Sequence, residues 1–380
     1  MDDKYKMPDG SLISFFSNKV KQFGGINLAQ GIPGFTPPEK LLKKLSKIAT
    51  NPNIHQYAPG IGNFTLLDKL CDHYKEKTPL TRDHLLIVQG ATEAVTLIYL
   101  YLKQLTGKLN VLGFDPVYES YNNLPRFFND AFTPFYLING SIDFSELEKS
   151  IIENKINLVF INSPGNPLGK VFTKTEVDTI IRLSEKHNFY IIIDAVYREL
   201  YFKQPPYIPV DINNYRLFYV NSFSKLFSIT GWRVGYFICH AEHMKKIRSM
   251  HDYTGLCVAN PIQTALSEYI SEEGIVNNYV TKLREKLKTS FDTLHKALTD
   301  FDFEIPPIDG GYFIWAKLPK PHDDGFRFAI DLYEQEKVAI IPGIHFSAKG
   351  KEYVRFNAAR ELSEIEAGIA GIKKFLKKDE

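Results

Sequence analysis

Seven short apolar runs that alternate with helical patterns constrain the fold of this chain more than any other feature. The runs are rich in β-branched and aromatic residues and nearly continuous, as expected for strands buried on both faces of a sheet. They cover residues 84–90, 110–116, 133–138, 157–164, 189–197, 216–223 and 234–240. Between them, residues 91–105 and 173–187 show the clearest helical patterns, the second with a capping box from Thr173 to Glu176. This alternation predicts an α/β fold with a mostly parallel seven-stranded sheet sandwiched by helices, and the short link before the last run predicts one antiparallel strand.

The pattern changes after about residue 275. A charged helical pattern over 277–298 is followed by an apolar run at 310–318, a further helix, a run at 353–359 and a terminal helical pattern at 362–378. These elements predict a smaller α+β domain. The first residues precede the sheet and contain no strand of comparable length, so we expect them to pack with it. We therefore predict a large domain over residues 46–275 and a small domain formed by residues 1–45 and 276–380.

Composition and charge argue against several classes of function. The chain has 44% hydrophobic and 24% charged residues and a formal net charge of +2, so no overall field indicates nucleic acid or membrane as a partner. Its three cysteines form no CxxC pattern, which fits a reducing compartment. The first ten residues lack the apolar segment of a secretory signal, and no apolar run is long enough to cross a bilayer. We expect a cytoplasmic protein with no nucleic-acid and no membrane partner.

A set of mostly polar residues lies at or just after the ends of the predicted strands, where open α/β sheets bind their ligands. They are Ala91, Thr92, Tyr118, Asn166, Asp194, Tyr197, Ser222, Lys225 and Arg233. Taken singly, most have a structural explanation such as a helix cap, a turn or a core position. One ligand accounts for all of them, namely an aromatic phosphate ester that carries an aldehyde. A lysine forms a Schiff base with it, a strand-end carboxylate pairs with a pyridinium nitrogen, and a helix N-terminus with a serine and an arginine binds the phosphate.

Other candidate signals are weaker. His240, His243 and His251 suggest a metal site, but the lysines around them favour a solvated helix start, so we expect no metal. The chain has no Walker motif and no dinucleotide-binding glycine motif.

Six motifs resemble, in order, those of the fold-type-I pyridoxal-phosphate enzymes, and specifically the class I/II aminotransferases. "SFSKLFSITGWRVG" is similar to the family's S-x-S-K-x-x-x-x-x-G-W-R-x-G motif, and "NSPGNPLG" to its N-P-x-N-P-x-G motif. "IIIDAVYREL" is similar to its D-E-x-Y strand, with Ala195 where the family usually has glutamate. "HQYAPGIG", "FDPVYESY" and "EYVRFNAA" complete a series that covers roughly residues 25 to 360. "INLAQGIPGF" and "SPGNPLGKVFTKTE" resemble the kynurenine/glutamine/methionine aminotransferase branch.

The resemblance implies a catalytic role for several of these residues. Lys225 would form the aldimine with pyridoxal 5'-phosphate and then act as general acid and base. Asp194 would keep the pyridine nitrogen protonated. Tyr197 and Asn166 would hydrogen-bond the phenolate oxygen of the cofactor, and Tyr118 would stack on its ring.

The resemblance also implies how phosphate and substrate are bound. The phosphate would be held by Ala91, Thr92, Ser222 and Arg233 of one subunit and by Tyr57 of a second, so the resemblance implies a homodimer with shared active sites. Arg355 would bind the α-carboxylate of the substrate as a planar fork, helped by Asn166 and the backbone at Gly31.

The motifs predict an aminotransferase that moves an α-amino group to a 2-oxo acid by a ping-pong mechanism. In dicarboxylate-specific relatives a second arginine commonly comes from the partner subunit, from the segment that corresponds to residues before Pro261, but residues 249–283 contain no arginine. We therefore expect an apolar, sulfur-containing, amide or aromatic donor, such as a methionine-, glutamine-, kynurenine- or phenylalanine-like amino acid. The expected side-chain pocket is formed by Leu12, Ile13, Phe15, Phe16, Leu256, Cys257, Val258 and Ala259.

Two other functions are compatible with parts of this pattern. A pyridoxal-phosphate-dependent cysteine-conjugate β-lyase on the same scaffold is the main alternative, because the same lysine serves both reactions. A keto-acid acceptor separates the two, since transamination needs one and elimination does not. A non-enzymatic regulator would need an added basic DNA-binding module, for which we see no room before Gly25, and it would not need the lysine.

Overall fold

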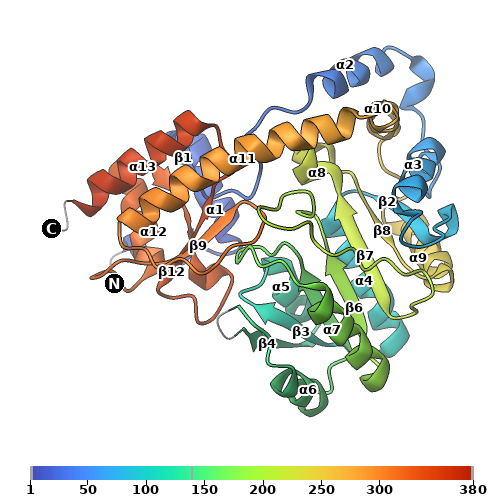
Figure 1. Ribbon diagram of the computed structural model, residues 1–380, viewed down its shortest axis with the longest axis horizontal. Coiled ribbons are helices and arrows are strands. Elements are labelled where there is room, and N and C mark those ends of the chain that lie inside the picture. The colour runs from blue at the N-terminus through green and yellow to red at the C-terminus, as the bar shows by residue number, and fades with distance from the viewer. Residues whose placement is uncertain (1–2, 138–139, 378–380) are drawn as a thin grey trace.

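The computed structural model describes residues 3–137 and 140–377, and its centre is a seven-stranded sheet (Figure 1). The strands are β2 (Leu85–Val88), β3 (Asn110–Asp115), β4 (Ala131–Tyr136), β5 (Leu158–Asn162), β6 (Tyr190–Asp194), β7 (Leu217–Ser222) and β8 (Gly235–Ile238). Their order is β2-β8-β7-β6-β5-β3-β4, and β8 alone runs antiparallel to its neighbours. The predicted α/β fold and its antiparallel strand are confirmed. Ile138 and Lys378, which end two predicted elements, lie outside the described residues.

Burial on both faces explains why the strands read as continuous apolar runs. In β6, Ile191 and Ile193 belong to the core on one face of the sheet, and Ile192 belongs to the core on the other. The helices of this unit are α2 (Glu39–Ile48), α3 (Phe64–Tyr74), α4 (Ala91–Thr106), α5 (Glu119–Phe127), α6 (Phe144–Glu153), α7 (Lys174–His187), α8 (Phe223–Leu226), α9 (Ala241–Thr254) and α10 (Asn260–Ile270). The predicted capping box at the start of α7 is present, with Thr173 and Glu176 bonded reciprocally. We call these strands and helices the sheet unit.

A second core lies beside the sheet unit and forms what we call the small unit. Its elements are α1 (Leu12–Phe23), β1 (Ile26–Asn27), β9 (Phe313–Lys317), α12 (Gly325–Glu336), β10 (Val338–Ala339), β11 (Ile341–Pro342), β12 (Tyr353–Asn357) and α13 (Leu362–Leu376). β11, β12 and β9 form an antiparallel sheet, and β1 pairs with β10. Figure 1 shows these elements grouped on the left, away from the seven-stranded sheet.

One long helix connects the two units. The helix α11 (Ile275–Asp300) packs Val276 and Tyr279 against the core of the sheet unit, and Phe291 and Leu298 in the core of the small unit. Figure 1 shows it crossing from one unit to the other. Leu41 of α2 lies in the core of the sheet unit although it precedes residue 46. The division at residues 45/46 and 275/276 stays a prediction.

Of the three histidines near α9, His240 caps the start of the helix and is partly exposed, whereas the other two occupy an environment that differs from the one we expected. His243 and His251 are fully buried, so the solvated helix start predicted for them is wrong. His243 Nδ1 lies 2.7 Å from the Tyr101 hydroxyl and Nε2 lies 2.7 Å from the Tyr215 carbonyl oxygen, and burial lowers the pKa of His243 to about 4. Both histidines lie on the buried face of α9 with Met244 and Ile247, at the spacing of an amphipathic helix. The prediction gave weight to the nearby lysines and overlooked this spacing.

None of the helices within residues 3–137 and 140–377 combines the length and apolar character needed to cross a membrane. In the same part of the chain, no group of three or more histidine, cysteine, aspartate or glutamate side chains is arranged to hold a metal ion.

Candidate active site

A cavity of about 230 Å³ lies at the carboxyl ends of the strands, where the small unit meets the sheet unit. With the exception of Tyr57, all the predicted site residues line it. They are Gly31, Ala91, Thr92, Tyr118, Asn166, Asp194, Tyr197, Ser222, Lys225, Arg233 and Arg355. The strand ends supply most of them, while Gly31 and Arg355 come from the small unit. The site is therefore assembled from both units of one chain.

Lys225 lies at the centre of this cavity, on the single-turn helix that follows β7. Its Nζ donates a hydrogen bond to the Gly31 carbonyl oxygen at 2.7 Å, and so links the sheet unit to the small unit. Burial, reinforced by the positive charges of Arg355 and Arg233, lowers the pKa of Lys225 to about 8. A lysine with such a pKa has an appreciable neutral fraction near physiological pH, and the neutral amine is the form that attacks a carbonyl.

Asp194 ends β6 and both of its carboxylate oxygens are fixed. Oδ2 accepts a hydrogen bond from the Tyr121 hydroxyl at 2.7 Å, and Oδ1 accepts one from the Val196 backbone N–H at 3.1 Å. Burial raises the pKa of Asp194, although these hydrogen bonds oppose the shift. Tyr121 itself is buried, and its ring stacks on Phe160 at 4.5 Å between centroids.

Sequence reasoning did not single out Tyr121. The available signal was its position three residues after Tyr118, because residues three apart lie on the same face of a helix. The two rings meet edge to face at 5.6 Å, so both point toward the cavity, which they line.

The start of α4 has the features of an anion site. Gly90 precedes the helix with φ +83°, and no side chain caps the helix there. A Cβ at Gly90 would lie 2.7 Å from Arg233 Nη2, so the glycine allows the guanidinium to approach the backbone closely. Arg233 donates to the carbonyl oxygens of Thr230 and Gln89, both at 3.0 Å. An uncapped helix N-terminus beside a guanidinium and the Ser222 hydroxyl suits a phosphate dianion.

Arg355 is fully buried in β12 and has no charged hydrogen-bond partner among the described residues. It donates to Asn166 Oδ1 at 2.9 Å and to the Ala29 carbonyl oxygen at 2.5 Å, and its Nε has no partner within residues 3–137 and 140–377. Its guanidinium carbon lies 4.2 Å and 4.7 Å from the ring centroids of Phe313 and Phe346. Burial lowers the pKa of Arg355 to about 10. A buried cation held by neutral oxygens fits an anionic ligand such as a substrate carboxylate.

Tyr197 and Gly31 lie on the wall between Lys225 and Arg355. The ring of Tyr197 packs edge-on against Tyr312 at 5.2 Å. The Tyr312 hydroxyl donates to the Gly31 carbonyl oxygen at 3.0 Å, the same oxygen that accepts from Lys225. In this structure the Gly31 backbone therefore orients the lysine.

Tyr57 does not reach the cavity of its own chain. Its side chain is 82% exposed and lines a surface hollow with Cys257, Ala259 and the outer side of Arg233. Val258, predicted to line a substrate pocket with Cys257 and Ala259, lines this same hollow, although it is 2% exposed and also packs in the core of the sheet unit. Of the predicted amino-terminal pocket residues, Ile13 lines the active-site cavity. Leu12 and Phe16 belong to the small core because they occupy the buried face of α1.

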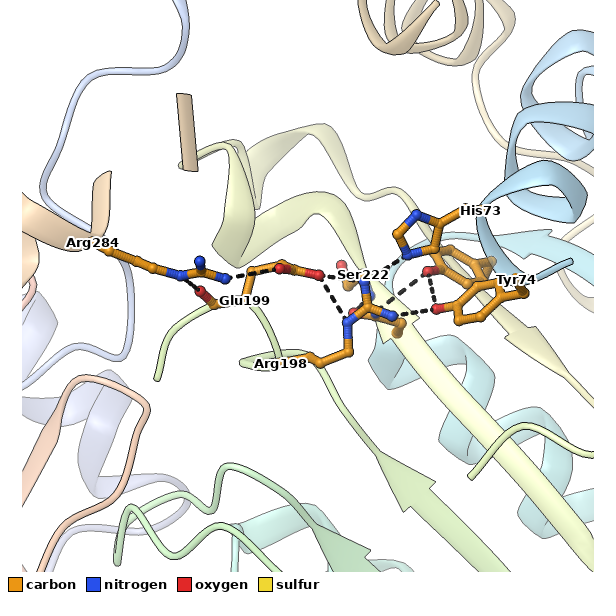
Figure 2. A network of polar contacts seen from close by, with 8 residues as sticks. His73, Tyr74, Arg198, Glu199, Ser222 and Arg284 are labelled. Carbon is orange, nitrogen blue, oxygen red and sulfur yellow. Dashed lines mark hydrogen bonds and ion pairs between the residues drawn. The ribbon is translucent and has the colours of Figure 1, made fainter. Parts of the chain in front are cut away.

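A polar network runs from the Ser222 backbone to α11 (Figure 2). It passes through Asn221, Tyr236, Tyr74, Arg198, Glu199 and Arg284. Arg198 is buried and donates to the Tyr74 hydroxyl at 2.9 Å, and Arg284 donates to Glu199 at 3.1 Å. The network ties the segment that carries Ser222 and Lys225 to the helix shared by both units. Sequence reasoning missed it, although the charged pair at 198–199 follows the buried strand β6 after only three residues.

Comparisons with known proteins agree with this chemistry. The family model for aminotransferase class I and II matches residues 24–372. A probable aspartate aminotransferase of Methanocaldococcus jannaschii is 28% identical over 92% of each chain. A probable kynurenine–oxoglutarate transaminase of Saccharomyces cerevisiae is 28% identical, over 92% of this chain and 86% of its own. The solved structure of an Escherichia coli protein identified as having a methionine aminotransferase function superposes with a TM-score of 0.85, covering 98% of this chain and 99% of that chain at 25% identity.

The branch indicated by the motifs is thus represented among the relatives, alongside enzymes named for other substrates. The uncapped helix start, the buried lysine and the buried arginine also match the phosphate, the aldehyde and the substrate carboxylate of pyridoxal 5'-phosphate chemistry. Because the family model spans nearly the whole sequence and its motif residues meet in one cavity, the protein is an enzyme that belongs to the class I and II aminotransferases, a fold-type-I family that uses pyridoxal 5'-phosphate.

Proposed function

We propose that the protein transfers the α-amino group of an uncharged amino acid to a 2-oxo acid, with methionine-, glutamine-, kynurenine- or phenylalanine-like donors preferred. One observation carries this proposal. Among the described residues that line the cavity, the lysine and arginine side chains are Lys225, Arg233 and Arg355, and each already has a partner in the expected chemistry. A second substrate carboxylate would find no cation there, and an unpaired buried charge costs several kcal/mol.

Each of the cavity residues is assigned a separate role in the reaction. When bound, pyridoxal 5'-phosphate draws electrons from the substrate Cα. Arg355 would bind the α-carboxylate and so orient the substrate Cα toward Lys225. The free amine of Lys225 would serve as the acid and base that moves the Cα proton, a role that suits a group whose pKa is about 8. Asp194 would hold a proton on the ring nitrogen of the bound cofactor, and Tyr197 and Asn166 would hydrogen-bond its ring oxygen.

The donor side chain is the first testable consequence. We expect methionine or phenylalanine to exceed aspartate in kcat/KM by at least about tenfold, which is a conservative fraction of the cost of an unpaired carboxylate. Steady-state kinetics with one common 2-oxo acid acceptor measures the ratio. Arg126 is a further cation near the site, but it lines an outer hollow and not the active-site cavity, so we do not expect it to pair with the side-chain carboxylate of aspartate. Aspartate as the best donor would contradict the proposal, and turnover without any acceptor would indicate elimination instead.

We also propose that the active form is a homodimer whose subunits complete each other's phosphate site. Tyr57 is 82% exposed beside Arg233 but outside the cavity, and Tyr253 and Leu256 expose apolar surface nearby, at 91% and 43%. The two segments are adjacent, since a Cβ at Gly60 would lie 3.1 Å from Asp252 Oδ1. An exposed aromatic patch beside a phosphate site is suited to a symmetric interface.

Subunit mixing tests this assembly. Tyr57→Ala and Lys225→Ala homodimers are each expected to have low activity, Tyr57→Ala through weaker cofactor binding. A mixed dimer contains one site with an intact Lys225 from one chain and an intact Tyr57 from the other, so activity should reappear on mixing. Sedimentation should show a dimer throughout. An active monomer, or no recovery in mixed dimers that have formed, would contradict the shared site.

A further inference from the structure

One acidic residue lines the active-site cavity without a part in the chemistry described above. Glu119 is the first residue of α5, directly after Tyr118, and lines the cavity with Ile13 and Ile32. It also lines an outer hollow of about 1010 Å³, together with Leu12. Glu119 therefore lies at the boundary between the reaction site and the space outside it.

The substrate side chain must extend toward this boundary. Arg355 takes the α-carboxylate, Lys225 faces Cα, and Asp194 with the start of α4 occupies the cofactor side. The rest of the lining includes Ile13, Ile32 and Glu119. Glu119 and Arg355 are close enough for each charge to shift the pKa of the other. A side chain attached to a substrate held by Arg355 thus passes close to the Glu119 carboxylate.

Glu119 is ionised in this setting. Burial raises its pKa, but the contact with His345 and the charge of Arg355 outweigh burial, so the pKa lies below its ordinary value. His345 Nε2 lies 2.9 Å from Glu119 Oε2. His345 belongs to the single turn Gly343–His345 of the small unit, and it lines the outer hollow but not the active-site cavity. Of these two side chains, Glu119 is therefore the one that lines the active-site cavity.

We propose that Glu119 is a specificity-determining residue that disfavours donors with an acidic side chain and favours uncharged side chains that carry an N–H donor, such as a carboxamide. A carboxylate only accepts hydrogen bonds, and repulsion between two carboxylates is stronger in a cavity than in water. The same group that repels glutamate can accept a hydrogen bond from glutamine, so one residue supplies both the attractive and the repulsive element. This inference rests on the proposed function, because it names the substrate class of the same site.

The test compares donors of equal shape and different charge. Glutamine against glutamate, and asparagine against aspartate, are each added to the cofactor-loaded enzyme without acceptor, and the absorbance change of the cofactor gives the rate of the first half-reaction. Wild type, Glu119→Gln and Glu119→Ser are compared. Glu153→Gln is the matched control, because Glu153 is an exposed carboxylate at the end of α6. Methionine serves as a donor that lacks both charge and an N–H group in its side chain.

We expect wild type to prefer the amide over the acid by at least about tenfold in each pair, and Glu119→Gln and Glu119→Ser to reduce that preference about tenfold. Most of the change should come from faster reaction of the acids, with the methionine rate within about threefold of wild type. Glu153→Gln should keep the wild-type ratio. An unchanged ratio in folded Glu119 variants would overturn the inference and leave the proposed function standing. If no amino acid converts the wild-type cofactor, the proposed function fails and the inference fails with it.

Discussion

Replacing Lys225 by alanine is expected to remove nearly all transamination, by about 10⁴-fold or more, while the folded protein still binds pyridoxal 5'-phosphate noncovalently. Positioned proton transfer by itself contributes about 10²–10⁴-fold, and this variant also loses the covalent attachment of the cofactor. Cofactor binding should survive because the anion site at α4 and Arg233 does not depend on the lysine amine. The protein should remain folded because, among the described residues, the amine hydrogen-bonds only the Gly31 carbonyl, which Tyr312 also contacts.

The experiment has a chemical readout that does not depend on the choice of substrate. Wild-type protein loaded with cofactor should absorb in the visible, and borohydride should fix the cofactor to Lys225, as read by mass spectrometry of the labelled peptide. Lys225→Ala should show no labelled peptide. Lys296→Ala, which changes an exposed lysine on α11, is the matched control and should retain both label and activity. Finding the label on another lysine in the wild type would falsify the assignment.

The position of Lys225 also shows why much of the site could be predicted from sequence. In a parallel sheet each strand is buried on both faces, so its apolar run is visible, and the polar residues after it lie at one edge of the sheet. Asp194 and Lys225 could be found in this way because Asp194 is the last residue of a buried strand and Lys225 lies three residues after the end of another. Arg355 and Gly31 could not be found by position alone, since they lie in the other unit. Only the family motifs indicated them.

What the sequence did not reveal depends on contacts between distant segments. Tyr121 was visible only as a helical neighbour of Tyr118, and its partner Asp194 is 73 residues away. The Tyr74 and Tyr236 hydroxyls that connect Arg198 to Asn221 are separated by 162 residues. Burial of His243 likewise depends on Tyr101, which lies on another helix. No local period predicts such pairs, because hydrophobic patterns report which face is buried and not which residue it meets.

The second large effect is expected at Asp194. Asp194→Asn keeps the size of the side chain and an oxygen for the Val196 N–H, but it removes the negative charge that holds a proton on the ring nitrogen of the cofactor. We expect kcat to fall by about 10³-fold, because charge stabilisation in a buried site commonly contributes about 10²–10³-fold per group. Asp72→Asn, an exposed aspartate on α3, is the matched control. Wild-type kcat in Asp194→Asn would show that the carboxylate has no part in the reaction.

A substitution at Tyr121 tests whether the reaction depends on the negative charge of Asp194 and not only on the presence of its side chain. Asp194 acts only when ionised, so activity depends on pH being above its pKa. Burial raises that pKa and the Tyr121 hydrogen bond lowers it. Tyr121→Phe removes the lowering contribution, so the pKa of Asp194 rises further and the acid limb of the kcat–pH profile should move to higher pH. At neutral pH the loss should be modest, about tenfold or less, because a single hydrogen bond to a charged group contributes about 1.5–3 kcal/mol and only part of it is felt in the reaction. A purely structural role for Tyr121 would lower kcat equally at every pH, whereas a role through the charge of Asp194 predicts a displaced acid limb and recovery at higher pH.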